Sequence, residues 1–66
     1  MTATSIEKAF GNKARFLSVL VMAELNARAE WECELTDAIR DRFEVHGMDT
    51  KLTSAERRQL SNLSRH

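Results

Sequence analysis

A single cysteine, two histidines and ten acidic residues are the side chains that could act here as a nucleophile, a general base or a metal ligand. Cys33 lies in the stretch AEWECELTD (29–37), with a glutamate on each side of it. Neighbouring carboxylates disfavour the thiolate that a catalytic cysteine needs. His46 is at the far end of the same predicted helix, too distant to serve as its base. We therefore expect Cys33 to be a structural thiol and the protein to have no catalytic residues, so that it is not an enzyme.

The same side chains do not form a recognisable metal site. Cys33, His46 and Asp49 have none of the spacings that zinc-binding sequences use. His46 falls in the last turn of a predicted helix, where the helix dipole favours a cation, and His66 is terminal. The sequence therefore predicts no metal, no cofactor and no small-molecule substrate.

Length and composition indicate one small domain over residues 1–66, with frayed ends at 1–4 and 65–66. A core of this size rarely supplies more than about 3–5 kcal/mol, so small proteins often rely on disulfides, metals or a partner subunit. One cysteine excludes an internal disulfide, which leaves self-association. Ten basic and ten acidic residues cancel, so no overall field attracts the chain to nucleic acid or to a membrane. The start MTATSIEKAF is unlike a signal peptide and no long apolar run is present, which favours a cytoplasmic protein.

The helix signals predict an all-α fold. There is no proline, and Gly11 and Gly47 are the only glycines. Thr4 with Glu7 fits a capping box that begins a first helix, and Gly11 either kinks this helix or ends it, with Asn12 capping the next one. No helix breaker occurs over residues 12–46, which are therefore predicted to form one helix about 50 Å long.

A short C-terminal helix is expected after this long one. Gly47 fits a helix C-cap, and Thr53 with Glu56 forms a second capping box that opens the short helix. The expected architecture is therefore a helical hairpin with an N-terminal extension.

The long predicted helix carries more apolar surface than the short helix can cover. An apolar seam follows one face of it, and residues 16–25 are apolar on nearly every side, so they must be covered on every side. The short helix offers only a few leucines. We therefore expect a homodimer, parallel or antiparallel, that forms a small helical bundle. Its predicted core consists of Phe16, Leu17, Val19, Leu20, Val21, Met22 and Leu25.

Glu24 and Arg28 both project onto the apolar seam. They are four positions apart with the acid first, the favourable order for a pair within one helix. A charged step within a seam can fix the register of a helix pair. The alternative is that both side chains reach solvent at the edge of the seam.

Five carboxylates form a narrow line along the predicted helix. We call this line the acidic stripe; it consists of Glu30, Glu34, Asp37, Asp41 and Glu44. The stripe is either a solvated face, opposite Arg57 and Arg58 of the short helix, or a docking face for a basic surface such as that of a DNA-binding regulator. Trp31 beside it is either part of the core or an anchor for a partner, since tryptophan is enriched at binding hot spots.

These features favour a small dimeric regulatory or inhibitory adaptor that binds a protein, of the kind that mobile elements and bacterial operons encode. One alternative is a DNA-binding dimer that reads DNA with its last helix in a helix-turn-helix arrangement. Its contacts would be Lys51, Arg57, Arg58, Gln59 and Asn62, although the neighbouring carboxylates oppose binding to phosphates. A second alternative is a structural subunit of a larger assembly.

Overall fold

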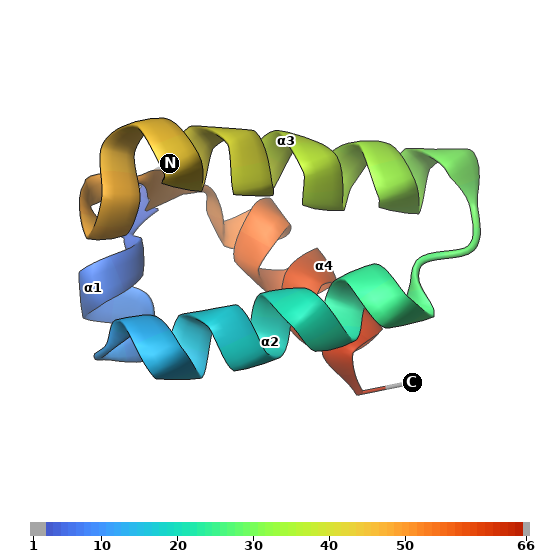
Figure 1. The fold of residues 1–66 in the computed structure, drawn as a ribbon, viewed down its shortest axis with the longest axis horizontal. Coiled ribbons are helices and arrows are strands. Elements are labelled where there is room, and N and C mark those ends of the chain that lie inside the picture. The colour runs from blue at the N-terminus through green and yellow to red at the C-terminus, as the bar shows by residue number, and fades with distance from the viewer. Residues whose placement is uncertain (1–2, 66) are drawn as a thin grey trace.

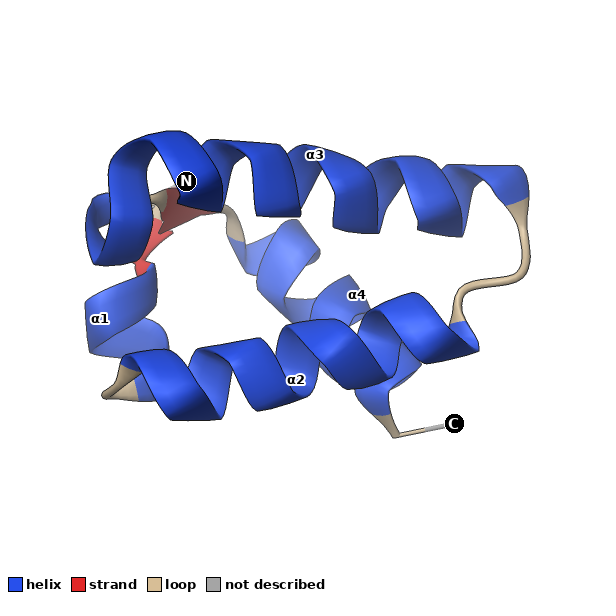
Figure 2. Ribbon diagram, in the orientation of Figure 1, coloured by secondary structure: helices blue, strands red, loops and turns tan. Residues whose placement is uncertain are grey.

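The computed structural model describes residues 3–65 as an all-α fold of four helices with one very short two-stranded ladder (Figure 1 and Figure 2), which confirms the predicted fold class. Residues 1, 2 and 66, which belong to the predicted frayed ends and include His66, lie outside the described residues. The elements in chain order are β1 (Thr4–Ser5), α1 (Ile6–Phe10), α2 (Lys13–Asn26), α3 (Glu30–His46), the 3-10 turn η1 (Gly47–Asp49), β2 (Lys51–Leu52) and α4 (Ser54–Ser64).

The single long helix predicted over residues 12–46 is wrong. The chain leaves the helical conformation after Asn26, and Ala27 and Ala29 have extended backbones with ψ of 125° and 152°. The Glu32 side chain makes this reversal possible, because one of its carboxylate oxygens accepts hydrogen bonds from the Arg28 and Ala29 amides, each at 2.9 Å. As a result α3 runs back alongside α2, joined to it by a three-residue loop (Figure 1).

Local capping signals set most of the other helix ends. Gly11 has a φ of 89° and ends α1, and the Asn12 side chain then accepts a 2.7 Å hydrogen bond from the Arg15 amide to begin α2. Gly47, with a φ of 61°, ends α3 as predicted. The capping box of Thr53 and Glu56 at the start of α4 is confirmed, with both reciprocal hydrogen bonds present.

The first helix begins one residue later than predicted. Ser5, rather than Thr4, is its N-cap, and the Ser5 hydroxyl accepts a 3.2 Å hydrogen bond from the Lys8 amide. Thr4 instead pairs with Leu52 in the antiparallel β1–β2 ladder, so the predicted fraying is wrong for this residue. The Ile6 amide extends the pairing with a 2.8 Å bond to the Thr50 carbonyl. The ladder thereby fixes the start of the chain beside the start of α4.

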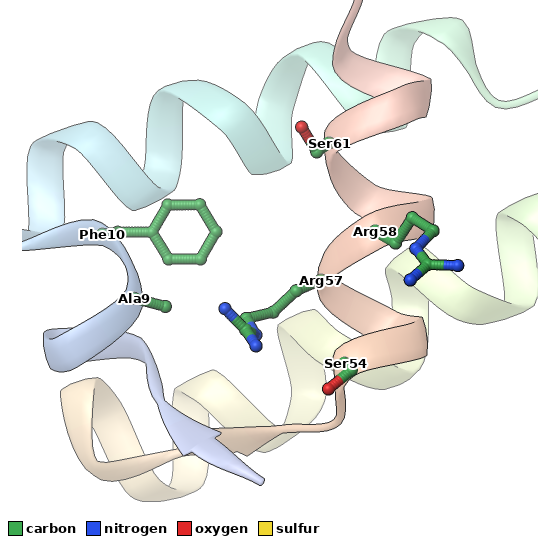
Figure 3. A pocket seen from close by; sticks show the side chains of 6 residues that line it. All are labelled: Ala9, Phe10, Ser54, Arg57, Arg58 and Ser61. Carbon is green, nitrogen blue, oxygen red and sulfur yellow. The ribbon is translucent and has the colours of Figure 1, made fainter. Parts of the chain in front are cut away.

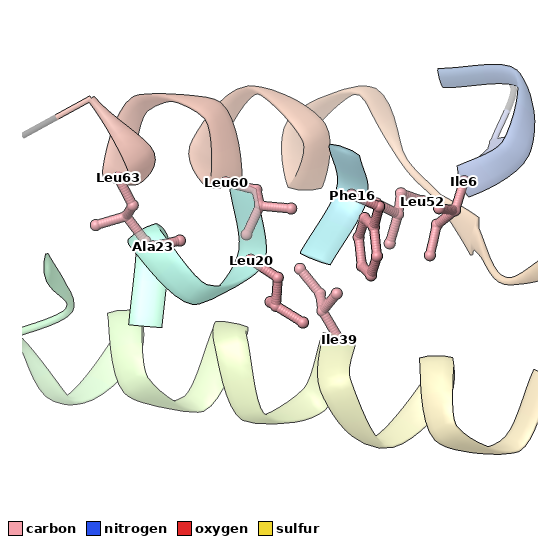
Figure 4. Close-up of a cluster of buried hydrophobic side chains, with 8 residues drawn as sticks. All are labelled: Ile6, Phe16, Leu20, Ala23, Ile39, Leu52, Leu60 and Leu63. Carbon is pink, nitrogen blue, oxygen red and sulfur yellow. The ribbon is translucent and has the colours of Figure 1, made fainter. Parts of the chain in front are cut away.

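One hydrophobic core joins all four helices. α4 packs across α2, and side chains from α2, α3 and α4 converge between them, while the ladder end supplies two more (Figure 4). The aromatic rings of Phe10 and Phe43 both contact that of Phe16, with centroid distances of 5.3 and 4.8 Å. The buried apolar residues are Ile6, Phe16, Leu20, Ala23, Ile39, Leu52, Leu60 and Leu63.

This core accounts for much of the apolar surface that the sequence assigned to a dimer. Phe16 and Leu20 are fully buried within one chain, because the reversal at residues 27–29 brings α3 over α2 and α4 covers another side. The remaining residues of the predicted dimer core differ in burial. Leu17 and Val19 are half-buried against the core, whereas Val21, Met22 and Leu25 are exposed. Burial of Phe16 and Leu20 thus needs no second copy, and dimerisation stays a prediction.

Candidate functional site

The acidic stripe lies on the outer face of α3. All five of its carboxylates are exposed, and among residues 3–65 none of them is within 4.0 Å of a basic group. α3 contains six acidic residues and two arginines, a net charge of −4 with His46 neutral. Neither arginine forms an ion pair with the stripe, because Arg40 and Arg42 pair with glutamates of other helices; Arg40 interacts with Glu44 only through its charge.

The first of these ion pairs connects α3 to α2. Arg40 donates from Nε and Nη2 to the two carboxylate oxygens of Glu24, at 2.5 and 2.7 Å. The hydrogen bond to Glu24 raises the pKa of Arg40; burial opposes this rise, and the charges of Glu24 and Glu44 add to it. The predicted pair of Glu24 with Arg28 is wrong, because α2 ends at Asn26 and Arg28 falls in the loop.

The second ion pair connects α3 to α4. Arg42 Nη2 donates to Glu56 Oε2 at 2.6 Å, and the other oxygen of Glu56 caps α4 through the Thr53 amide. Each carboxylate oxygen of Glu56 therefore accepts a hydrogen bond within the chain. The basic residues of α4, Arg57 and Arg58, lie at a pocket bordered by α1 and make no ion pair with the stripe.

Apolar side chains are exposed at the end of the molecule where the stripe begins. Leu25, in the last turn of α2, is 71% exposed, and Trp31, in the first turn of α3, is 53% exposed. Trp31 is thus not a core residue. Val21 and Met22 extend the exposed apolar surface along α2. A line of carboxylates with an accessible tryptophan at one end combines the two components of a protein-binding surface, charge and an aromatic anchor.

The residues of the alternative DNA-binding surface do not share one environment. Lys51 is exposed on β2, and Arg58, Gln59 and Asn62 are exposed on one face of α4. Arg57 is half-buried and extends toward α1, whereas Arg58 points away from it (Figure 3). α1 and α4 both pack on α2 and border one pocket; this arrangement has no counterpart in the sequence pattern, so the pocket was not predicted.

Cys33 and His46, the two other candidates that the structure describes, both lie on the surface of α3. Cys33 is exposed on α3 and free, and His46 is exposed in the last turn of that helix. Within the described part of the chain, no three His, Cys, Asp or Glu side chains gather in a way that could hold a metal ion. None of the helices of residues 3–65 combines the length and apolar character needed to cross a membrane.

Comparison with known proteins gives no family to which these surfaces could be assigned. The chain matches no protein-family model, no curated protein and no solved structure. Function must therefore be inferred from the stripe, the exposed apolar residues and the pocket themselves.

Proposed function

We propose that this protein is a small regulatory or inhibitory adaptor that binds another protein through the acidic stripe and Trp31. The observation that carries the proposal is the set of five exposed carboxylates on α3, none of which forms an ion pair with a basic residue among residues 3–65. A partner with a basic surface, such as the DNA-binding face of a regulator, would neutralise them.

The two components of this surface contribute differently to binding. Complementary charge chiefly raises the association rate and selects the partner. Desolvation of a large aromatic side chain supplies affinity, and a single tryptophan can contribute about 2 kcal/mol or more. Trp31 lies one residue after Glu30, so one partner surface can contact both.

The exposed apolar side chains of α2 support a homodimer as the functional form. Val21, Met22 and Leu25 lie on one face of the helix, at positions i, i+1 and i+4. Their contact with the same face of a second copy would leave the outer face of α3 free. Such a dimer would present two acidic stripes, and paired sites strengthen binding to a dimeric partner.

The proposal is tested by reversing the charge of the stripe. Glu34→Lys/Asp37→Lys should fold normally but lose capture of basic proteins in a quantitative pull-down, because the complementary field is removed. The matched control is Glu7→Lys/Asp49→Lys, which changes the net charge equally at exposed acids outside α3. An unchanged set of captured proteins with the stripe variant, at wild-type yield, would contradict the proposal.

A second candidate, binding of duplex DNA, is favoured by one observation. Arg58, Gln59 and Asn62 share an exposed face of α4 and have the side chains used to contact bases and phosphates. If this candidate is right, the wild-type protein should retard duplex DNA in a low-salt gel shift. If the migration of the DNA does not change, DNA binding is excluded as the function.

A further inference from the structure

Arg57 is a charged side chain that has no acceptor among residues 3–65. Its Nε is shielded from solvent and has no hydrogen-bond partner. No ion pair or side-chain hydrogen bond to its guanidinium is present in the described chain. A shielded donor without a partner is unfavourable, and native proteins rarely retain one unless it has a role.

Arg42 provides an internal comparison. Its Nε is also without a partner, yet its charge is neutralised by the 2.6 Å contact between Nη2 and Glu56. Glu56 adjoins Arg57 in the sequence, but its two oxygens accept hydrogen bonds from Arg42 and from the Thr53 amide, and it forms no ion pair with Arg57. Arg57 is therefore left without a counter-charge from its own chain.

The side chain of Arg57 extends into a pocket of about 470 Å³ between α1 and α4 (Figure 3). This volume lies within the range of small-molecule sites, about 300–1,000 Å³. Ser54 and Ser61 are three positions before and four positions after Arg57, so they lie on the same face of α4. Their hydroxyls border the pocket at opposite ends and add hydrogen-bonding capacity to the polar wall.

The opposite wall of the pocket is apolar. Ala9 and Phe10 of α1 form it. The Phe10 ring is held by an edge contact with Phe16, which is fully buried, so this wall is attached to the core. The pocket therefore has a fixed aromatic side facing a cationic, hydroxyl-bearing side.

We propose that this pocket binds a small organic oxyanion. The phosphoryl or carboxylate group of the ligand accepts hydrogen bonds from Arg57, whose planar fork of donors matches either group. An apolar or aromatic portion of the ligand packs on Phe10. This site is separate from the acidic stripe of α3, so it adds a ligand-binding function to that of the proposed adaptor.

The proposal is tested with phenyl phosphate, benzoate and inorganic phosphate as probes, titrated into ¹⁵N-labelled protein. Phenyl phosphate or benzoate should shift the amide resonances of Ala9, Phe10, Ser54 and Ser61 and should bind more tightly than inorganic phosphate. Arg57→Met should weaken this binding about tenfold or more, the usual effect of losing a charge-assisted hydrogen bond.

Two control variants separate a specific site from general attraction. Arg28→Met removes the same charge from an exposed side chain of the α2–α3 loop, which is not among the residues that line the pocket, and binding should change by less than about threefold. Phe10→Ala should reduce the affinity for phenyl phosphate to that for inorganic phosphate. Arg57→Met should melt no lower than the wild type, because it removes a donor that has no partner.

Three outcomes would overturn the proposal. The first is the absence of shifts at the pocket amides for every probe up to about 10 mM. The second is an equal loss of binding in Arg57→Met and Arg28→Met. The third is a response of these amides to duplex DNA alone, which would assign Arg57 to the DNA-binding candidate instead.

Discussion

The ion pair between Glu24 and Arg40 affects the charges around it on α3. Two parallel hydrogen bonds join these side chains across the α2–α3 interface. The pair occupies one of the two arginines of α3, so that arginine is not available to the acidic stripe. The hydrogen bond to Glu24 raises the pKa of Arg40 further above its already high usual value, so the guanidinium of this pair stays charged.

Replacement of Glu24 by glutamine should lower the melting temperature. Partly exposed ion pairs contribute up to about 1 kcal/mol, which corresponds to a decrease of at most about 4–8 °C in a domain of this size. Thermal unfolding followed by circular dichroism measures the effect. The control is Glu34→Gln, which neutralises an unpaired carboxylate of the stripe and should cause no decrease. An equal decrease in both variants would show that the ion pair contributes nothing.

Among the elements, the loop between α2 and α3 determines the architecture. Arg28 and Ala29 favour helix intrinsically, so nothing in their types indicates a break. The conformation is instead stabilised by Glu32 and by the Asn26 side chain, whose Nδ2 donates a 2.7 Å hydrogen bond to the Leu63 carbonyl of α4. The second of these contacts joins positions far apart in the chain, and local sequence reasoning could not identify it.

The start of α3 has only half of a capping box, and completing it should stabilise the protein. Ala29 occupies the N-cap with the extended backbone typical of this position but has no side-chain acceptor. Ala29→Ser supplies one for the Glu32 amide and should add about 1 kcal/mol, raising the melting temperature by about 4–8 °C.

The control for this prediction is the same substitution in the middle of the helix. Ala38 is exposed on α3, where serine is a poorer helix former than alanine, so Ala38→Ser should lower the melting temperature slightly. If the melting temperature changed in the same direction and by the same amount in both variants, this result would contradict a capping effect at residue 29.

Elements with local signals were predictable from the sequence, and elements that depend on distant partners were not. Three local signals act over four residues or fewer, and the structure has all of them: the Asn12 cap, the Gly47 helix end and the Thr53–Glu56 capping box. The β1–β2 ladder has two residues in each strand, too few to produce an alternating pattern. Its formation depends on a partner at the other end of the chain.

As a whole molecule, one chain is already as compact as an ordinary domain. Its radius of gyration is 10.7 Å, against about 10.8 Å expected for a folded chain of this length. A long exposed rod would be far more extended. The compact shape of one chain does not depend on the proposed dimer, so folding and dimerisation can be tested separately.

Charge introduced on α2 should abolish dimerisation without unfolding the chain. Met22 and Leu25 are exposed, so Met22→Glu/Leu25→Glu removes no core contact. In sedimentation equilibrium, the wild type should have twice the chain mass of 7.6 kDa and the variant a single chain mass. Val45→Glu, at the exposed far end of α3, should remain dimeric. A wild type that sediments as a single chain at every concentration would contradict the dimer.

The candidate sites differ in how far the sequence could reveal them. The acidic stripe depends on the spacing of residues along one continuous helix. The chain reversal at residues 27–29 does not disrupt this spacing, because all five residues lie within α3. The pocket forms where α1 and α4, which both pack on α2, face each other, and the exposure of Trp31 follows from the reversal at residues 27–29. Both therefore depend on tertiary structure.

The short ladder has a consequence for how the protein is made. It joins the fourth residue to the fifty-second, and closing so long a loop loses chain entropy that only nearly complete packing offsets. Thr4 and Ser5 emerge from the ribosome early but have no pairing partner until Lys51 and Leu52 have cleared the exit tunnel. Ile6, which lies next to the ladder and is buried in the core, therefore cannot take its final place until Lys51 and Leu52 are available.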